Sequence, residues 1–338
     1  MSEKSSWNRR RLLQAGAVAG IASLAPRAMA NERPGWRDGP SLPVPVQEIY
    51  PCLHEGRIHV AGGFVAADGR ITGPTAAHHV LDVASGAWQA GTPLPVARHH
   101  PQLISFSGSL YCIGGFESHQ AGAWQMKRDV WRHAGEDEGW VAGPEMPAPN
   151  GESVVGILGR NLHVVGGRQP SGTRNLDWND HTDTGAHWVF DGTAWGDAAP
   201  LPTPRNSAAG IVADGRLHVV GGRTVSGGNT PVHEVYDHWS DRWERLAPMP
   251  KAQGGLAAGV VGDRLYAFGG EFFNNGGGVY REAWEYDTME DRWRAIADMP
   301  KPRHGLGGVT VGNDIYLIGG ARQRGGSRTS AAVEIYRP

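Results

Sequence analysis

The chain has 338 residues, of which 50 are glycine, about twice the usual share of ~7%. Its 32 basic and 34 acidic side chains give a formal net charge of −2. This balance excludes a basic nucleic-acid-binding domain and provides no attraction to anionic membranes.

The first 30 residues have the pattern of an export signal. Residues 8–14, Asn-Arg-Arg-Arg-Leu-Leu-Gln, resemble a twin-arginine motif, and an apolar stretch at 15–25 and a small-x-small site ending at Ala30 follow. A membrane anchor is the alternative, but the stretch is shorter than the ~20 residues that span a bilayer. We therefore predict cleavage after Ala30 and a periplasmic location. The mature chain would keep 27 basic and 33 acidic residues, a net charge of −6, so we expect neither nucleic acid nor a membrane as partner.

Six tryptophans set a repeat that covers the rest of the chain. Each is followed by a proline seven residues later and by a glycine pair 26 residues later, and the period is 48 to 55 residues. The tryptophans are Trp36, Trp88, Trp140, Trp195, Trp243 and Trp293. Periods near 50 are typical of radial arrays of small sheets, and an uninterrupted repeat argues for one domain. Insertions fall only between the glycine pair and the next tryptophan, so this part of each unit is where function varies.

Each unit has the pattern of four antiparallel strands. In the fourth unit, apolar segments at 207–213 and 217–220 flank a polar turn, as in a hairpin. A third strand at 234–237 and the tryptophan strand complete the unit. One unit cannot bury both of its faces, whereas six units closed in a ring can. The chain begins with a tryptophan strand and ends after a third strand at 334–336, so we predict that the N-terminal strand completes the last sheet.

The repeat resembles that of the kelch family. Its pattern is a glycine pair, a third strand that ends in Tyr-Asp, and a spaced tryptophan, as in Gly221-Gly222, Tyr236-Asp237 and Trp243. The resemblance extends from Trp36 to Pro338. It implies an all-β, six-bladed kelch β-propeller over residues 31–338, with four antiparallel strands per blade and a ring closed by the N-terminal strand. Kelch propellers serve as enzymes, sugar-binding modules and protein-interaction platforms, so the resemblance leaves the function open.

Several cysteines and histidines are expected to be structural. Cys52 and Cys112 fall in strands of neighbouring units, which seldom allow the close Cα approach of a disulfide, so we predict two buried thiols. Three histidines share the slot three residues before the glycine pair, where other units have tyrosine: His59, His163 and His218. We expect this slot to be a packing and hydrogen-bonding position. Three more histidines near third strands are expected at the surface or at an edge: His78, His79 and His233.

The geometry of the repeat predicts a ligand site at one mouth of the central channel. The first strand begins at the repeat proline and the second ends at the glycine pair, so these ends and the variable loops share a face. Positions three and four after the proline and the position after the glycine pair therefore surround the mouth. They include these charged or titratable residues: Arg98, His99, Arg168, Arg205, Arg223, Glu271, Arg303 and His304. Arginine forks bind carboxylates bidentately, which predicts a small anionic sugar or glycan as the ligand.

A structural role is the alternative for three of these arginines. A Pro-Arg step is part of the kelch pattern, so Arg98, Arg205 and Arg303 could bond carbonyls between sheets. The pattern explains Arg168 and Arg223 less well, and these two carry more of the binding hypothesis. Glu271 is the sole acid directly after a glycine pair.

The longest variable loop belongs to the third unit and contains four candidate metal ligands. They are Asp177, His181, Asp183 and His187, and Asp and His are ligand types for iron, zinc or manganese. The loop loosely resembles the Glu-x3-Asp-x3-His series with which plant kelch specifier proteins hold iron. Asn179 stands here in place of the glutamate and is a weak ligand. We therefore predict a solvated lid, no metal and no cofactor.

The fifth unit resembles bacterial sialic acid mutarotases (N-acetylneuraminate epimerases), which are periplasmic kelch propellers without a metal. In that family a glutamate after a glycine and an arginine just before the third strand serve the sugar, and Glu271 and Arg281 occupy these positions here. The resemblance implies anomeric interconversion of a sialic-acid-like sugar, with Glu271 as general acid and base. Arg281, Arg168 and Arg223 would hold the sugar carboxylate. The rival hypothesis is a non-catalytic module that binds a glycan or a partner protein through the variable loops.

Overall fold

The computed structural model describes residues 34–119, 122–135 and 137–338, and the leader predicted at 1–30 lies outside these residues. Within Pro34–Pro338, a compact unit, six four-stranded antiparallel sheets (blades 1 to 6) follow one another along the chain. Blade 1 consists of β3 (Cys52–His54), β4 (Arg57–Ala61), β7 (His78–Asp82) and β8 (Ala87–Gly91). Blade 2 consists of β9 (Gln102–Phe106), β10 (Ser109–Ile113), β13 (Val130–His133) and β14 (Trp140–Ala142). Blade 3 consists of β15 (Val154–Leu158), β16 (Asn161–Val165), β19 (His187–Phe190) and β20 (Trp195–Asp197). Blade 4 consists of β21 (Ala209–Ala213), β22 (Arg216–Val220), β25 (His233–Asp237) and β26 (Arg242–Arg245). Blade 5 consists of β27 (Ala257–Val261), β28 (Arg264–Phe268), β31 (Ala283–Asp287) and β32 (Arg292–Ala295). Blade 6 consists of β33 (Gly307–Val311), β34 (Asp314–Ile318), β35 (Val333–Arg337) and β1 (Gly35–Asp38).

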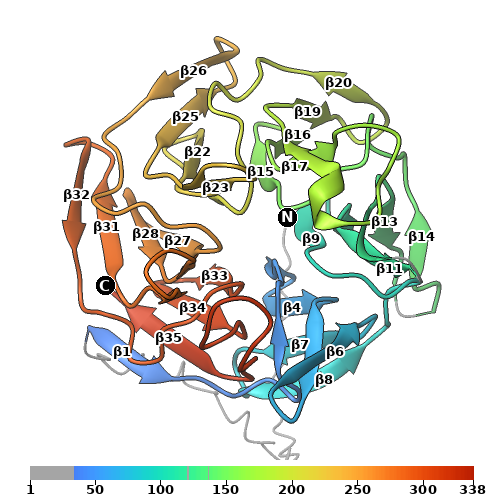
Figure 1. Cartoon of the computed structure of the whole chain (residues 1–338), viewed down its shortest axis with the longest axis horizontal. Coiled ribbons are helices and arrows are strands. Elements are labelled where there is room, and N and C mark those ends of the chain that lie inside the picture. Colours follow the sequence, from blue (N-terminus) through green and yellow to red (C-terminus); the bar gives the residue numbers. More distant parts are fainter. Residues whose placement is uncertain (1–33, 120–121, 136) are drawn as a thin grey trace, which may run out of the picture. The chain divides into compact units, whose positions relative to one another are not determined.

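The first strands of the six sheets surround a common centre (Figure 1). Each contacts the first strand of the next sheet, in the order β3, β9, β15, β21, β27 and β33, and β33 in turn contacts β3. The last sheet contains strands from both ends of the described chain, because β1 pairs antiparallel with β35 and aligns Trp36 with Tyr336. The strands predicted from the repeat coincide with the observed ones to within two residues in blade 4. The all-β architecture of repeated four-stranded sheets is confirmed.

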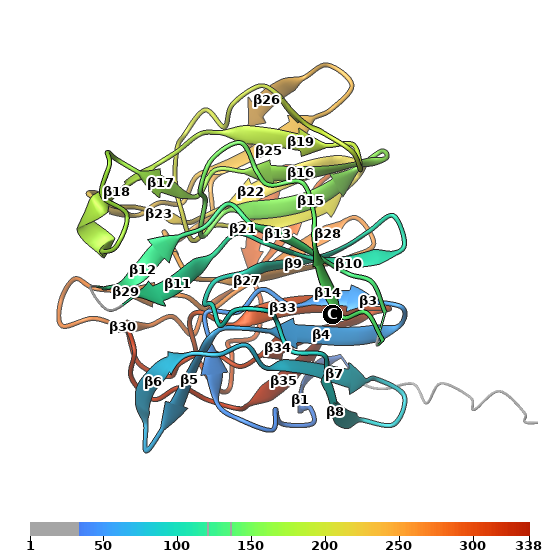
Figure 2. The same cartoon turned by 90° about the vertical axis from the view of Figure 1, so that its right-hand side faces the viewer.

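Short hairpins extend from the glycine ends of the blades on one face of the ring (Figure 2). They are β2 (Val46–Gln47) with β5 (Phe64–Ala67) and β6 (Arg70–Pro74), β11 (Phe116–His119) with β12 (Gly122–Met126), β17 (Arg168–Pro170) with β18 (His181–Asp183), β23 (Arg223–Thr224) with β24 (Gly228–Asn229), and β29 (Glu271–Phe272) with β30 (Gly278–Val279). A single 3-10 turn among the described residues, η1 (Trp178–Asp180), precedes β18. Among these residues, none of the helical segments is long and apolar enough to cross a membrane.

The six repeat tryptophans connect each blade to its neighbour. Each indole Nε1 donates a hydrogen bond to a carbonyl four residues after the tryptophan of the preceding unit; Trp88 donates to Pro40, for example, at 2.9 Å. Trp140, Trp195, Trp243 and Trp293 repeat the contact. Trp36 makes the same contact to Ala297 at 3.1 Å, which joins the first strand of the chain to the fifth unit. The repeat tryptophans are therefore wedges between sheets.

Histidine pairs bridge the second and third strands of three blades. Nδ1 of the first histidine lies 2.8–3.0 Å from Nε2 of the second in these pairs: His59 with His78, His163 with His187, and His218 with His233. The predicted hydrogen-bonding slot is confirmed. The prediction that His78 and His233 lie at the surface or at an edge is wrong, because they are 3% and 0% exposed and belong to interior strands of their sheets. Burial lowers the pKa of both His163 and His218 to about 4, so these imidazoles are neutral at pH 7.

The two cysteines are unpaired. Cys52 in β3 is half-buried, Cys112 in β10 is buried, and both are free thiols. Burial raises the pKa of Cys112 to about 11, so it remains a neutral thiol at pH 7.

Candidate functional site

The side chains three residues after the repeat prolines hold the glycine turns. Five of them donate to the carbonyl of the first glycine of their own blade, at 2.6–3.0 Å: Arg98, Asn150, Arg205, Gln253 and Arg303. The three arginines also meet buried or half-buried acids, for example Glu234 at 2.5 Å from Arg205 and Glu334 at 2.9 Å from Arg303. They are at most 1% exposed. The donors of Arg98, Arg205 and Arg303 serve the blades, as the structural alternative for these arginines expects.

The residues five positions after the prolines form a belt around the channel. Their φ values are all positive, from 50° to 70°: Glu48, His100, Glu152, Ser207, Gly255 and Gly305. Main-chain hydrogen bonds join successive members, including Glu48 N to Gly305 O at 2.7 Å and His100 N to Glu48 O at 3.0 Å. Left-handed backbone is uncommon for residues other than glycine, and such residues cluster at functional sites. Blades 1 to 3 carry charged or titratable side chains at the belt, and blades 4 to 6 carry small ones.

Six side chains from the belt and its neighbours form a closed ring in which acids and bases alternate. In order they are Glu48, His100, Glu152, Arg223, Glu271 and His304, and we call this set the charge ring. His100 Nε2 lies 2.9 Å from Glu48 and 3.3 Å from Glu152. Arg223 lies 3.9 Å from Glu152 and donates to Glu271 at 2.6 Å. His304 Nδ1 completes the ring, 3.5 Å from Glu271 and 3.6 Å from Glu48.

Electrostatics favour the charged forms of Glu48 and Arg223. Burial by itself raises the pKa of the Glu48 carboxyl, but the nearby His100, His304 and Arg223 outweigh it and hold that pKa well below its usual range. Burial opposes the charge of Arg223, yet Glu271 and Glu152 more than compensate and raise its pKa. Glu271 is anchored at both oxygens, because Oε2 also accepts from the Gly325 amide at 2.8 Å. The site therefore presents fixed charges rather than mobile ones.

The charge ring opens on a cavity of about 250 Å³, which we call the inner cavity. Besides residues of the ring, its walls include four aromatic side chains: Phe64, Trp124, Trp178 and Phe273. Several buried polar atoms here have no hydrogen-bond partner among the described residues, including both carboxylate oxygens of Glu152, Nδ1 of His304 and Nε of Arg223. Buried polar groups are nearly always paired, so such a concentration marks a site for a polar ligand.

Arg168 and His99 lie beside the inner cavity without lining it. The guanidinium of Arg168 lies 3.3 Å from the ring centroid of Trp178 and 3.6 Å from Glu152, and it is fully buried. His99 is sandwiched between Phe64 and Phe116, with ring centroids 3.9 and 5.0 Å away. Burial holds the pKa of His99 well below its usual value, so it is neutral. Both residues support the walls rather than face the ligand.

The four candidate metal ligands do not converge. His187 belongs to the histidine pair in blade 3, Asp177 is exposed beside η1, and Asp183 accepts hydrogen bonds from Asn206 and the Val225 amide. His181 packs beside Phe116, and burial lowers its pKa to about 4. Within residues 34–119, 122–135 and 137–338, no group of three His, Cys, Asp or Glu side chains is arranged to hold a metal ion.

The structure separates Arg281 from the other predicted site residues. Its side chain is 67% exposed, pairs with Asp298 at 2.8 Å and does not line the inner cavity. Glu48, His100 and Glu152 are not among the residues predicted from the sequence, because they lie five positions after the proline rather than three or four. A usable signal was present, because three units place glycine or serine at this position and three place glutamate or histidine there.

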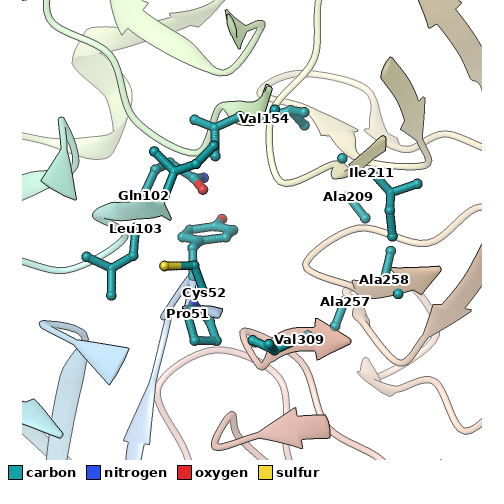
Figure 3. A pocket seen from close by; sticks show the side chains of 18 of the residues that line it. Pro51, Cys52, Gln102, Leu103, Val154, Ala209, Ile211, Ala257, Ala258 and Val309 are labelled. Atoms are coloured by element: carbon teal, nitrogen blue, oxygen red, sulfur yellow. The ribbon is translucent and has the colours of Figure 1, made fainter. Parts of the chain in front are cut away.

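The channel beyond the belt is narrow and largely apolar. It encloses about 330 Å³ and is lined by the first strands of all six blades. Figure 3 shows the side chains of Cys52, Leu103, Val154, Ile211, Ala258 and Val309 around it. Small residues on the side of blades 4 to 6 widen it there. Ionisable groups concentrate instead at the charge ring, which borders the inner cavity.

Comparisons with known proteins agree with this architecture. The family described as "Kelch motif" matches residues 204–250 and 254–300. The chain is 26% identical to Kelch-like protein terF of Aspergillus terreus, over 55% of this chain and 40% of that protein. It is 28% identical to mouse Kelch-like protein 35, over 60% and 39%. The chain thus spans less than half the length of these curated relatives. The solved structure of YjhT superposes with a TM-score of 0.73 and 19% identity, over 87% of this chain and 95% of that one. The chain therefore contains kelch motifs on a β-propeller fold similar to that of YjhT.

Proposed function

We propose that this propeller binds a small anionic sugar in the inner cavity and catalyses its anomeric interconversion. The observation that carries the proposal is the charge ring, which places fixed acids and bases beside aromatic walls and beside buried polar atoms without partners. Sugars match this combination, because their ring faces pack on aromatic side chains and their hydroxyl groups both donate and accept. The set of arginines that could hold the anionic group is smaller than the set predicted from the sequence, because only Arg168 and Arg223 remain near the cavity.

Arg223 is the group best suited to an anionic substituent of the sugar. It lines the cavity, and its Nε has no hydrogen-bond partner among the described residues. Its Nη1 is held by Glu271, which fixes the plane of the guanidinium. A fixed guanidinium fork binds a carboxylate with less loss of side-chain freedom than a mobile one. Phe64 and Trp124 would cover the apolar face of the sugar.

Anomeric exchange needs a base for the anomeric hydroxyl group and an acid for the ring oxygen, both of which are bonded to the anomeric carbon. The base removes the proton of the anomeric hydroxyl, the bond between the anomeric carbon and the ring oxygen breaks, and the acid protonates that oxygen. Closure on the other face of the carbonyl reverses these transfers and gives no net change of atoms. Glu271, which Arg223 and the Gly325 amide hold in position, suits the base, and His304, whose Nδ1 lies 3.5 Å from Glu271, suits the acid.

The test is calorimetric binding and NMR exchange spectroscopy on residues 31–338. We expect N-acetylneuraminate to bind and its anomers to exchange faster than in buffer, while a neutral hexose binds more weakly. Glu271→Gln keeps the hydrogen-bonding shape, so binding should persist while the acceleration is lost. Arg292→Ala, an exposed arginine of blade 5, is the matched control. Binding without accelerated exchange would indicate a non-catalytic sugar-binding module, and absence of binding to any acidic sugar would refute the proposal.

We further propose that the protein acts in the periplasm after export and cleavage at Ala30. The support is the leader pattern at residues 8–30. The N-terminal sequence of protein isolated from a periplasmic extract should begin at Asn31. An intact leader on active protein in the cytoplasm would contradict this.

A further inference from the structure

A second and larger cavity adjoins the inner one on the face that carries the hairpins. It measures about 590 Å³, and we call it the outer groove. Its walls come from η1, from the β23–β24 hairpin and from the β29–β30 hairpin, which belong to the loops of blades 3, 4 and 5. Figure 2 shows these elements on the same side of the molecule. The outer groove is more than twice as large as the inner cavity.

The two cavities share a wall. Trp178, Arg223 and Phe273 line both of them. Asn229 links them as well, because its Nδ2 donates to the main-chain oxygen of Glu271 at 2.6 Å and lies 3.4 Å from the hydroxyl of Tyr280. A ligand in the inner cavity therefore lies next to the outer groove, with Trp178, Arg223 and Phe273 at the boundary.

The chemistry of the outer groove differs from that of the inner cavity. No acidic side chain lines it, and apart from Arg223 its polar side chains are neutral: Thr224, Ser226, Asn229, Asn274 and Tyr280. Phe272 and Tyr280 form an aromatic wall with ring centroids 5.0 Å apart, and Phe273 is 54% exposed. Hydroxyl and amide groups beside aromatic faces suit a sugar ring, whereas fixed acids and bases for proton transfer are confined to the inner cavity.

We propose that the outer groove is a second sugar subsite. The ligand is then an oligosaccharide whose reducing-end acidic sugar occupies the inner cavity and whose next residue packs on Phe272 and Tyr280. This inference rests on the proposed function and deepens it, because it names the substrate as a glycan fragment rather than a free monosaccharide. The inner cavity, at about 250 Å³, is the smaller of the two, which suits a single sugar residue there.

The test compares N-acetylneuraminate with its α2,8-linked dimer by calorimetry on the mature protein. We expect the dimer to bind about tenfold more tightly or better, which corresponds to ~1.4 kcal/mol. Tyr280→Ala should remove this advantage and leave the affinity for the monosaccharide within about twofold. Ser226→Trp, which fills the groove from the facing loop, should have the same effect without removing a wall. Trp239→Ala removes an aromatic side chain that is 87% exposed and outside the groove, and it is the matched control.

The outcomes separate the two proposals. If the monosaccharide binds and the dimer binds no more tightly, the subsite is wrong and the proposed function stands. The subsite is also wrong if Tyr280→Ala and Ser226→Trp leave the advantage of the dimer intact, or if Trp239→Ala removes it. If neither sugar binds, the proposed function fails, and the second subsite fails with it.

Discussion

Acidification from pH 7 to pH 5 should strongly destabilise the propeller, because three histidine pairs are buried in the neutral form. Burial lowers the folded-state pKa of His78, His163 and His218 to about 4, against an ordinary value near 6.5. The unfolded chain therefore binds more protons between pH 6.5 and pH 4. The stabilisation is complete above pH 6.5 and is lost as the pH falls towards 4.

The magnitude follows from the two pKa values. At pH 5 an unfolded histidine is almost fully protonated and a folded one with a pKa of about 4 is mostly neutral, which costs about 2 kcal/mol per group. One proton per pair gives a loss of about 6 kcal/mol for the three pairs. This is comparable to the whole stability of a typical domain, about 5–15 kcal/mol. The urea midpoint should therefore fall steeply between pH 6.5 and pH 5.

The repeat itself provides the variant that tests this reasoning. In blade 5 the same two positions hold Tyr266 and Ala283 in place of a histidine pair. The double variant His218→Tyr with His233→Ala copies that combination into blade 4, and the loss of stability from pH 7 to pH 5 should shrink by about 2 kcal/mol. Tyr266→Phe changes the equivalent slot without an imidazole and should leave the pH dependence as it is. Urea unfolding followed by circular dichroism measures all three proteins, and an unaltered pH dependence in the double variant would refute the assignment.

Four further predictions concern the termini, the charge ring and the loop of blade 3. Deleting residues 31–45 removes β1 and exposes an edge of β35, so the truncated protein should melt lower and aggregate; melting like that of the longer protein would contradict the role of this strand. Arg223→Ala leaves Glu271 buried without its partner and should cost about 3–5 kcal/mol in unfolding experiments. Arg223→Lys keeps a charge but loses the fork and should weaken binding of N-acetylneuraminate about tenfold in calorimetry. Prolonged treatment with EDTA should leave the melting temperature unchanged, and stoichiometric iron or zinc lost on Asp183→Ala would refute this.

The position of the charge ring shows where sequence reasoning reached its limit. Of the residues that the repeat predicted at the channel mouth, Arg223 and Glu271 line the inner cavity, and His304 lies 3.5 Å from Glu271. The repeat left binding and structural roles open for Arg98, Arg205 and Arg303, and the structure shows that each of these side chains donates to a glycine carbonyl of its own blade. A spacing along the chain cannot distinguish a side chain that enters the channel from one that returns to the sheet.

The period of tryptophan, proline and glycine pair determined the number of blades, the strand order and the wedge role of the tryptophans, because these features depend on contacts that recur in every unit. The tertiary structure alone decided which residues meet across the channel. Glu48, Glu152 and Glu271 come from three different blades, and the left-handed backbone at the belt turns the first two toward the cavity. The burial of His78 and His233 was likewise decided by the tertiary structure, because nothing in the local sequence marks these positions and their hydrogen-bond partners lie on the adjacent strand. Local periodicity encodes a blade, whereas the site depends on the closure that brings six different blades around one channel.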